Sequence, residues 1–188
     1  MTKRVLFGLT MVMALGATPT ANAQEILDRE FLVGPRVGIA TIGWDLGAEN
    51  GSRPAPLVTV GIDLRKELGT WVLRGSSDLQ IGVDLEAGGL SLDLGANVYL
   101  TDSSAAPYLG AVLGLRAGSG PYDYNAIALG FGGNGQLGMM FNRTSSIRFF
   151  VEASVGAHFM SYQPDSLGTP TPPGYLRSEF AVAGGVLF

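Results

Sequence analysis

The chain has 188 residues, with no cysteine, 28 glycines, 46% hydrophobic residues and a formal net charge of −4. Its length suits one domain with at most a small appendage, and its composition excludes a disordered chain, a disulfide-stapled small protein and a cysteine-ligated metal site. With only 12 lysines and arginines, the chain is also a poor candidate for binding nucleic acid.

The N-terminus has the pattern of a cleavable signal peptide, which predicts a signal over 1–23 and one domain over 24–188. Two basic residues precede an apolar run over 5–17. This run is shorter than the roughly 20 apolar residues that a membrane-spanning helix needs. Small residues then form an A-x-A pattern, and the predicted cleavage site consists of Ala21, Ala23 and Gln24.

The rest of the chain alternates apolar and polar side chains with a period of two, which indicates strands with one apolar and one polar face. The pattern is clearest over 79–86 and 90–101, and no segment shows a sustained helical stripe. Glycine and small polar residues blur the strand boundaries around 66–77 and 130–138. The chain is therefore predicted to be all-β, with eight strands over 32–44, 58–65, 79–86, 90–101, 108–116, 126–141, 149–159 and 177–188.

Strands of this length suit a tilted bilayer crossing, which takes about 9–11 residues. An even number of antiparallel strands can also close into a barrel without exposed edges. The pattern thus predicts an eight-stranded antiparallel transmembrane β-barrel with an up-and-down meander. Three of the four predicted connections at one end are longer than two of the three at the other, as in barrels with long external loops and short periplasmic turns, and the exceptions are 87–89 and 66–77. They cover 45–55, 87–89, 118–125 and 160–174 at one end, and 66–77, 102–106 and 142–146 at the other.

A soluble lipocalin-like barrel or a periplasmic β-sandwich would show the same alternation, because alternation alone does not say which face points inward. The C-terminal strand favours the membrane barrel. It ends on an aromatic residue preceded by alternate apolar positions, with Gly184 as a gap, and the row consists of Phe180, Val182, Val186 and Phe188. This ending resembles the C-terminal signature that the assembly machinery of bacterial outer-membrane barrels recognises.

The signal peptide, eight strands and terminal Phe188 together make the chain similar to the small barrel family typified by the outer membrane protein A transmembrane domain, outer membrane protein X and the opacity proteins. The resemblance extends over about 31–188. It implies a location in the outer membrane, contact with outer-membrane lipids and recognition by the barrel assembly machinery.

If the apolar face meets lipid, the polar face lines a narrow interior. Five positive and six negative groups lie on that face, and buried charges are costly unless they are paired. An eight-stranded barrel has an interior only wide enough for side chains to fill, which argues against a wide pore. The predicted ion-pair network comprises Arg36, Asp63, Arg65, Asp84, Glu86, Asp93, Arg116, Arg148, Glu152, Arg177 and Glu179.

Two motif matches carry no function in this interpretation. The glycines at 130, 132 and 135 match a dinucleotide-binding fingerprint, but that motif requires a following helix, and no helical pattern is present. The Asn142-Arg143-Thr144 sequon falls in a predicted periplasmic turn. Both matches are better explained by strand packing and turn formation.

Glu152, Ser154 and His158 share one face of a predicted strand and raise the alternative of a hydrolase. Some outer-membrane barrels are lipid A deacylases whose motif resembles H-x-S-N, whereas this chain reads His158-Phe159-Met160-Ser161. Ser154 and His158 also lie roughly 13 Å apart along the strand, which is too far for proton transfer. We therefore expect no enzymatic activity, no metal and no cofactor.

The sequence favours an integral outer-membrane protein with a structural or surface-interaction role. Tyrosines and prolines in 45–55, 118–125 and 160–174 are candidates for contacting an unidentified ligand outside the cell. A channel for small solutes or hydrophobic compounds and a lipid A-modifying enzyme remain the alternatives.

Overall fold

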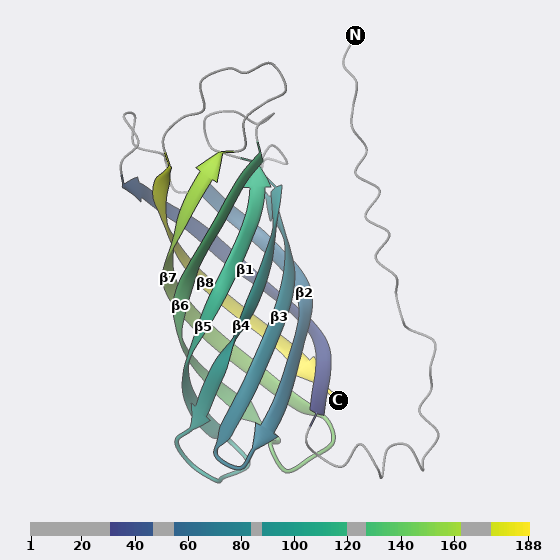
Figure 1. Ribbon diagram of the computed structural model, residues 1–188. Coiled ribbons are helices and arrows are strands. Elements are labelled where there is room, and N and C mark those ends of the chain that lie inside the picture. The colour runs from purple at the N-terminus through teal and green to yellow at the C-terminus, as the bar shows by residue number, and fades with distance from the viewer. Residues whose placement is uncertain (1–30, 47–54, 84–87, 120–126, 163–173) are drawn as a thin grey trace.

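The computed structural model describes residues 31–46, 55–83, 88–119, 127–162 and 174–188. These residues form one closed barrel of eight strands (Figure 1). The predicted signal peptide and its cleavage site lie outside the described residues. The strands are β1 (Phe31–Leu46), β2 (Ala55–Leu68), β3 (Trp71–Gly82), β4 (Gly88–Tyr99), β5 (Ala106–Ser119), β6 (Ile127–Phe141), β7 (Arg148–Tyr162) and β8 (Tyr175–Leu187).

Each strand pairs antiparallel with the next one along the chain, and β8 closes the barrel against β1. The predicted up-and-down meander is therefore confirmed. Closure extends to the last residue, because Val33 and Phe188 exchange backbone hydrogen bonds of 3.3 and 3.0 Å. No helix long and apolar enough to cross a membrane occurs in the described part of the chain.

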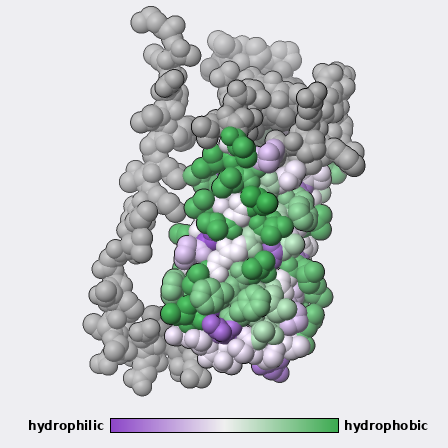
Figure 2. Space-filling view, turned by 180° about the vertical axis from the view of Figure 1, so that it is seen from behind, coloured by the Kyte–Doolittle hydropathy of each residue, from purple (hydrophilic) through white to green (hydrophobic). Residues whose placement is uncertain are grey.

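The apolar residues of the alternating pattern face outward, as predicted. Leu94 and Leu113 are 72% and 76% exposed on the outer wall, whereas Asp63 and His158 are completely buried inside. Figure 2 shows hydrophobic residues over most of the described height of one side of the barrel. This arrangement is the reverse of a soluble barrel, in which the apolar side chains fill the interior, so the facing assigned from the sequence is confirmed.

The two ends of the barrel differ in their connections. One end, here called the turn end, carries the short connections 69–70, 100–105 and 142–147. Strand β1 begins and strand β8 ends at this same end. The opposite end, here called the loop end, carries the connections between β1 and β2, β3 and β4, β5 and β6, and β7 and β8. The segments 47–54, 84–87, 120–126 and 163–173 of these connections lie outside the described residues.

The predicted connection over 66–77 is wrong. Strand β2 continues to Leu68, a two-residue turn follows at 69–70, and β3 begins at Trp71. Gly69 makes the tight turn possible with a backbone φ of +70°, a conformation in which a side chain would be strained. The predicted turn over 87–89 is also shifted, because Gly88 and Gly89 already belong to β4.

Apolar side chains fill the interior near the turn end. This apolar floor is a packed layer of fully or nearly fully buried residues that consists of Leu32, Val72, Tyr99, Ala106, Tyr108, Met140, Phe150 and Leu187. A smaller apolar cluster of Ala128, Met160 and Tyr175 lies near the loop end. Most charged residues of the interior lie between these two groups, whereas Arg148 lies at the turn end.

Candidate functional site

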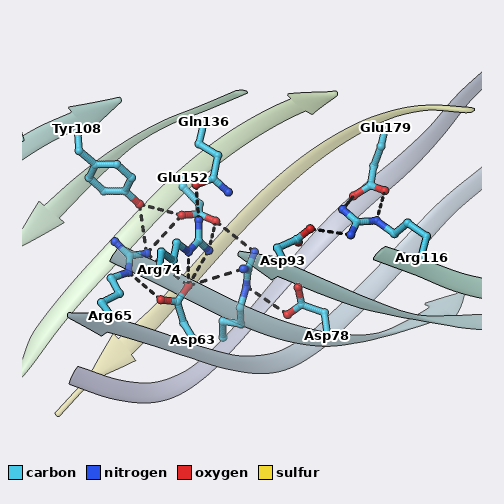
Figure 3. A network of polar contacts seen from close by, with 11 residues as sticks. Asp63, Arg65, Arg74, Asp78, Asp93, Tyr108, Arg116, Gln136, Glu152 and Glu179 are labelled. Atoms are coloured by element: carbon cyan, nitrogen blue, oxygen red, sulfur yellow. Dashed lines mark hydrogen bonds and ion pairs between the residues drawn. The ribbon is translucent and has the colours of Figure 1, made fainter. Parts of the chain in front are cut away.

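The buried charges form two clusters in the barrel interior (Figure 3). The turn-side cluster lies above the apolar floor and consists of Arg36, Asp63, Arg65, Arg74, Asp78, Tyr108, Gln136 and Glu152. The loop-side cluster consists of Asp93, Arg116, His158 and Glu179. Three arginines face three carboxylates in the turn-side cluster, so its formal charges balance.

Arg74 is the central donor of the turn-side cluster. Its Nη2 donates to Oδ2 of Asp63 and to Oε1 of Glu152, each at 2.6 Å. Its Nε also donates to Asp63 at 2.9 Å, and its Nη1 donates to Oε1 of Gln136 at 2.6 Å. The rigid fork of a guanidinium suits this role, because its donors point in fixed directions toward several acceptors at once.

Arg65 joins the turn-side cluster to the apolar floor. Its Nε donates to Oδ1 of Asp63 at 2.7 Å and its Nη2 to Oε2 of Glu152 at 3.3 Å. The guanidinium also lies 4.3 Å from the ring centroid of Phe150 and 5.1 Å from that of Tyr108. Tyr108 in turn donates its hydroxyl to Glu152 at 2.9 Å. A weakly hydrated guanidinium can therefore satisfy its charge and stack on aromatic rings at the same level.

Arg36 extends the turn-side cluster toward the middle of the barrel. Its Nη2 donates to Oε1 of Glu152 at 3.2 Å, and its Nη1 lies 3.7 Å from Oδ2 of Asp63. On its other side, its Nε lies 3.2 Å from Oδ1 of Asp78. Glu152 thus contacts three arginines, whereas Asp78 is paired with Arg36 alone among the ion pairs of the described residues.

Arg116 organises the loop-side cluster. It donates from Nε and Nη2 to the two oxygens of Glu179 at 3.0 and 3.2 Å, which makes this pair bidentate. Its Nη1 donates to Oδ1 of Asp93 at 2.7 Å. Nδ1 of His158 lies 4.0 Å from Oε2 of Glu179. Gly114 leaves the necessary room, since a Cβ there would lie 2.3 Å from Asp93 Oδ1 and 2.6 Å from Arg116 Nη1.

The remaining predicted network residues have different positions. Arg148 belongs to neither cluster and instead forms an ion pair with Glu67 at the turn end. Arg177 is buried and lies opposite His158 in the register of β7 and β8. Asp84 and Glu86 lie outside the described residues.

Sequence reasoning missed several members of the network, above all Arg74 and Asp78. Both lie on β3, in or next to the segment assigned to a connection. The outward positions between them are Gly75 and Ser77, so the apolar half of the alternation disappears there. A signal was still available, because Arg74, Asp78 and Gln80 keep the inward parity of the strand.

Comparison with known proteins identifies the architecture. No protein-family model and no curated protein matches the sequence. The structure is similar to that of Neisserial surface protein A, with 17% identity and a TM-score of 0.58, covering 83% of this chain and 95% of that one. It is also similar to the outer membrane protein OprG from Pseudomonas aeruginosa, with 14% identity and a TM-score of 0.50, covering 85% of this chain and 96% of that one.

The chain has the fold of the small outer-membrane β-barrels. At 17% and 14% identity the likeness concerns the fold alone. The interior clusters are defined by contacts within this chain. They brace the wall from within, because each cluster joins strands that are not neighbours in the sheet. The arginines and carboxylates at the centres of the clusters have one another as partners.

Glu152, Ser154 and His158, which raised the hydrolase alternative, all lie on β7. Glu152 and His158 nevertheless belong to different clusters. Glu152 accepts hydrogen bonds in the turn-side cluster, whereas His158 lies in the loop-side cluster beside Glu179. Among the described residues, no group of three or more histidine, aspartate or glutamate side chains is arranged to hold a metal ion.

Proposed function

We propose that the protein is an integral outer-membrane barrel with a structural or surface-interaction role and no catalytic activity. One observation carries this proposal: the wall exposes aliphatic and aromatic side chains around the barrel, while the charges are paired inside. Such a surface is stable in hydrocarbon, and a closed barrel leaves no backbone edge to lipid. In water the same wall would be a large apolar patch.

The outer membrane is favoured over other membranes by both ends of the chain. Residues 1–23 have the pattern of an export signal, and Phe188 ends a strand of the type that barrel assembly machinery recognises. The two similar structures are named as a surface protein and as an outer membrane protein, which supports the same location. The turn end would then face the periplasm and the loop end the cell exterior.

The filled interior supports a surface role. The apolar floor and the two ionic clusters occupy the barrel between its ends, so we infer that solutes do not pass through it in bulk. Contacts with other molecules would then involve the loop end, whose connections contain tyrosines and prolines. We propose an unidentified extracellular ligand for this end.

The test is to express the full chain in a Gram-negative cell and to separate the soluble, inner-membrane and outer-membrane fractions. We expect a shortened, folded barrel in the outer membrane and no steady conductance after reconstitution into planar bilayers. Recovery from the soluble periplasm would overturn the membrane assignment, and a stable conductance would favour the channel alternative. Release of acyl chains from purified lipid A would favour the enzyme.

A further inference from the structure

Arg143 contacts all three connections of the turn end. It lies in 142–147, and its Nη2 donates to the carbonyl oxygen of Gly69 in the first turn at 3.0 Å. Its Nη1 donates to the carbonyl oxygen of Thr101 in the second connection at 3.2 Å, and its backbone N–H donates to the carbonyl oxygen of Ser104 at 3.0 Å. One residue therefore joins three segments that are far apart in sequence.

The same side chain lies across the mouth of the barrel. Its guanidinium carbon is 4.0 Å from the ring centroid of Tyr99, a residue of the apolar floor that is almost completely buried. Beside it, Glu67 accepts hydrogen bonds from Tyr99 at 3.0 Å and from Arg148. The guanidinium therefore covers inward-facing groups and is not turned away into solvent.

The backbone of two turns is shaped to permit these contacts. Asn142, directly before Arg143, has a φ of +55°, and Gly69 has a φ of +70°. Both values belong to the left-handed region that tight turns use. The Gly69 carbonyl accepts from Arg143, whereas the Asn142 carbonyl accepts from the backbone N–H of Ser145 at 2.8 Å and so closes the turn that carries Arg143. The planar fork of arginine can then reach the carbonyls of Gly69 and Thr101 together.

We propose that Arg143 is a latch that holds the three turns together and keeps water out of the apolar floor. The carbonyl hydrogen bonds and the stacking on Tyr99 carry the latch. The ion pair with Asp102 contributes little, because that carboxylate is 84% exposed and exposed pairs are weak. Short turns without such a tie open readily, since their backbone is in contact with water.

The natural absence of cysteine allows a direct accessibility test. Ala106 lies in the apolar floor and is completely buried, so Ala106→Cys reports water entry at the turn end. Ala128, buried near the loop end, supplies the matched reporter Ala128→Cys. Exposed Ser146 gives a fully reactive reference as Ser146→Cys. Each full-length reporter is folded in detergent micelles and its reaction with a water-soluble thiol reagent is timed.

In the parent, both buried reporters should react far more slowly than Ser146→Cys. Arg143→Ala should accelerate the Ala106→Cys reporter by roughly tenfold or more, the factor that corresponds to the loss of one hydrogen bond to a charged group. The same change should leave the Ala128→Cys reporter unaltered. Asp102→Asn is the control variant and should leave both rates unaltered.

If the Ala106→Cys thiol reacts at an unchanged rate in folded Arg143→Ala protein, the latch is overturned. An equal rise in the reaction rates of Ala106→Cys and Ala128→Cys would also overturn it, because it would indicate that the whole barrel has loosened. If Arg143→Ala does not fold, Arg143→Lys decides the question, because lysine keeps the charge but lacks the fork that joins the turns. Acceleration at Ala106→Cys alone then supports the latch, and no acceleration overturns it. Since the measurement is made in detergent, its outcome is independent of the proposed membrane location.

Discussion

Arg74 and Glu152 meet at 2.6 Å across the full width of the barrel, although three strands separate β3 from β7 in either direction around the wall. Side chains on such opposed strands touch only if the interior is narrow and if both reach its centre. The pair therefore acts as a cross-brace, and it holds the wall at a fixed diameter independently of the hydrogen bonds between neighbouring strands.

Neutralising Glu152 should destabilise the barrel without opening it. Glu152→Gln preserves the side-chain volume but leaves Arg36, Arg65 and Arg74 with too little negative charge. Loss of one member of a buried network typically costs about 3–5 kcal/mol. We expect the free energy of unfolding in urea, measured from the change in gel mobility, to fall by this amount. We also expect no conductance in planar bilayers.

The matched control for Glu152→Gln is Asp78→Asn, which weakens a single pair with Arg36. We expect a smaller loss of stability for Asp78→Asn. Equal losses for the two variants would contradict the central role assigned to Glu152, and a steady ion current through Glu152→Gln would show that the cluster acts as a gate.

An arginine on the outer wall should be costly near the bilayer centre. Leu92 and Val151 are exposed on the lipid-facing side, and Leu92→Arg or Val151→Arg should cost about 2–4 kcal/mol in lipid vesicles. Leu100→Arg, at the turn end, is the control and should cost about 0–1 kcal/mol because it lies near the interface. If all three variants lost equally little stability, the outer wall would not be in contact with lipid.

The terminal residue should matter more in cells than in detergent. Deleting Phe188 removes two backbone hydrogen bonds to Val33 and an exposed ring whose burial in lipid contributes about 1.5–3 kcal/mol. Phe188→Ala retains the backbone bonds and so isolates the ring. If the ring is read by assembly machinery, both variants should lower the outer-membrane yield more than the refolding yield. A parallel decrease in the two yields would speak against such a signal.

Glycine is required opposite Tyr108. A Cβ on Gly138 would lie 2.3 Å from the Tyr108 ring and would push the phenol away from Glu152. Gly138→Ala should therefore destabilise the barrel by about 1–3 kcal/mol, the usual cost of overpacking. Gly135→Ala on the same strand is the control, because a Cβ there would come no closer than 3.9 Å to a backbone oxygen. Unfolding curves that rank the two variants equally would contradict this account.

The fold could be predicted because its strands alternate so regularly. Apolar residues such as Leu92 and Leu94 repeat every second position, and this period predicts the strand and its two faces. The outward direction of the apolar face was assigned from the C-terminal strand and the export signal. The charge balance inside followed from the same parity. It predicted that Asp63, Arg65 and Glu152 are inward, and in the structure Arg65 donates hydrogen bonds to both carboxylates.

The contacts between side chains on opposite sides of the interior could not be predicted. Strand parity gives a face but not a partner, so the contact between Arg74 and Glu152 has no local signature. Tyr108 shared the inward face, yet its place in an apolar floor depends on residues from seven other positions around the barrel. Arg143 looked like an ordinary turn residue, because its partners come from two other connections.

The burial of the ionic clusters has a consequence for how the barrel responds to salt. Arg74 and Arg116 are each only 3% exposed, so mobile counterions have little access to them. Dissolved salt therefore cannot stand in for a missing partner as it does at an exposed pair. Charge balance inside the barrel is thus set by the carboxylates that the sequence itself supplies and not by the ionic strength of the medium.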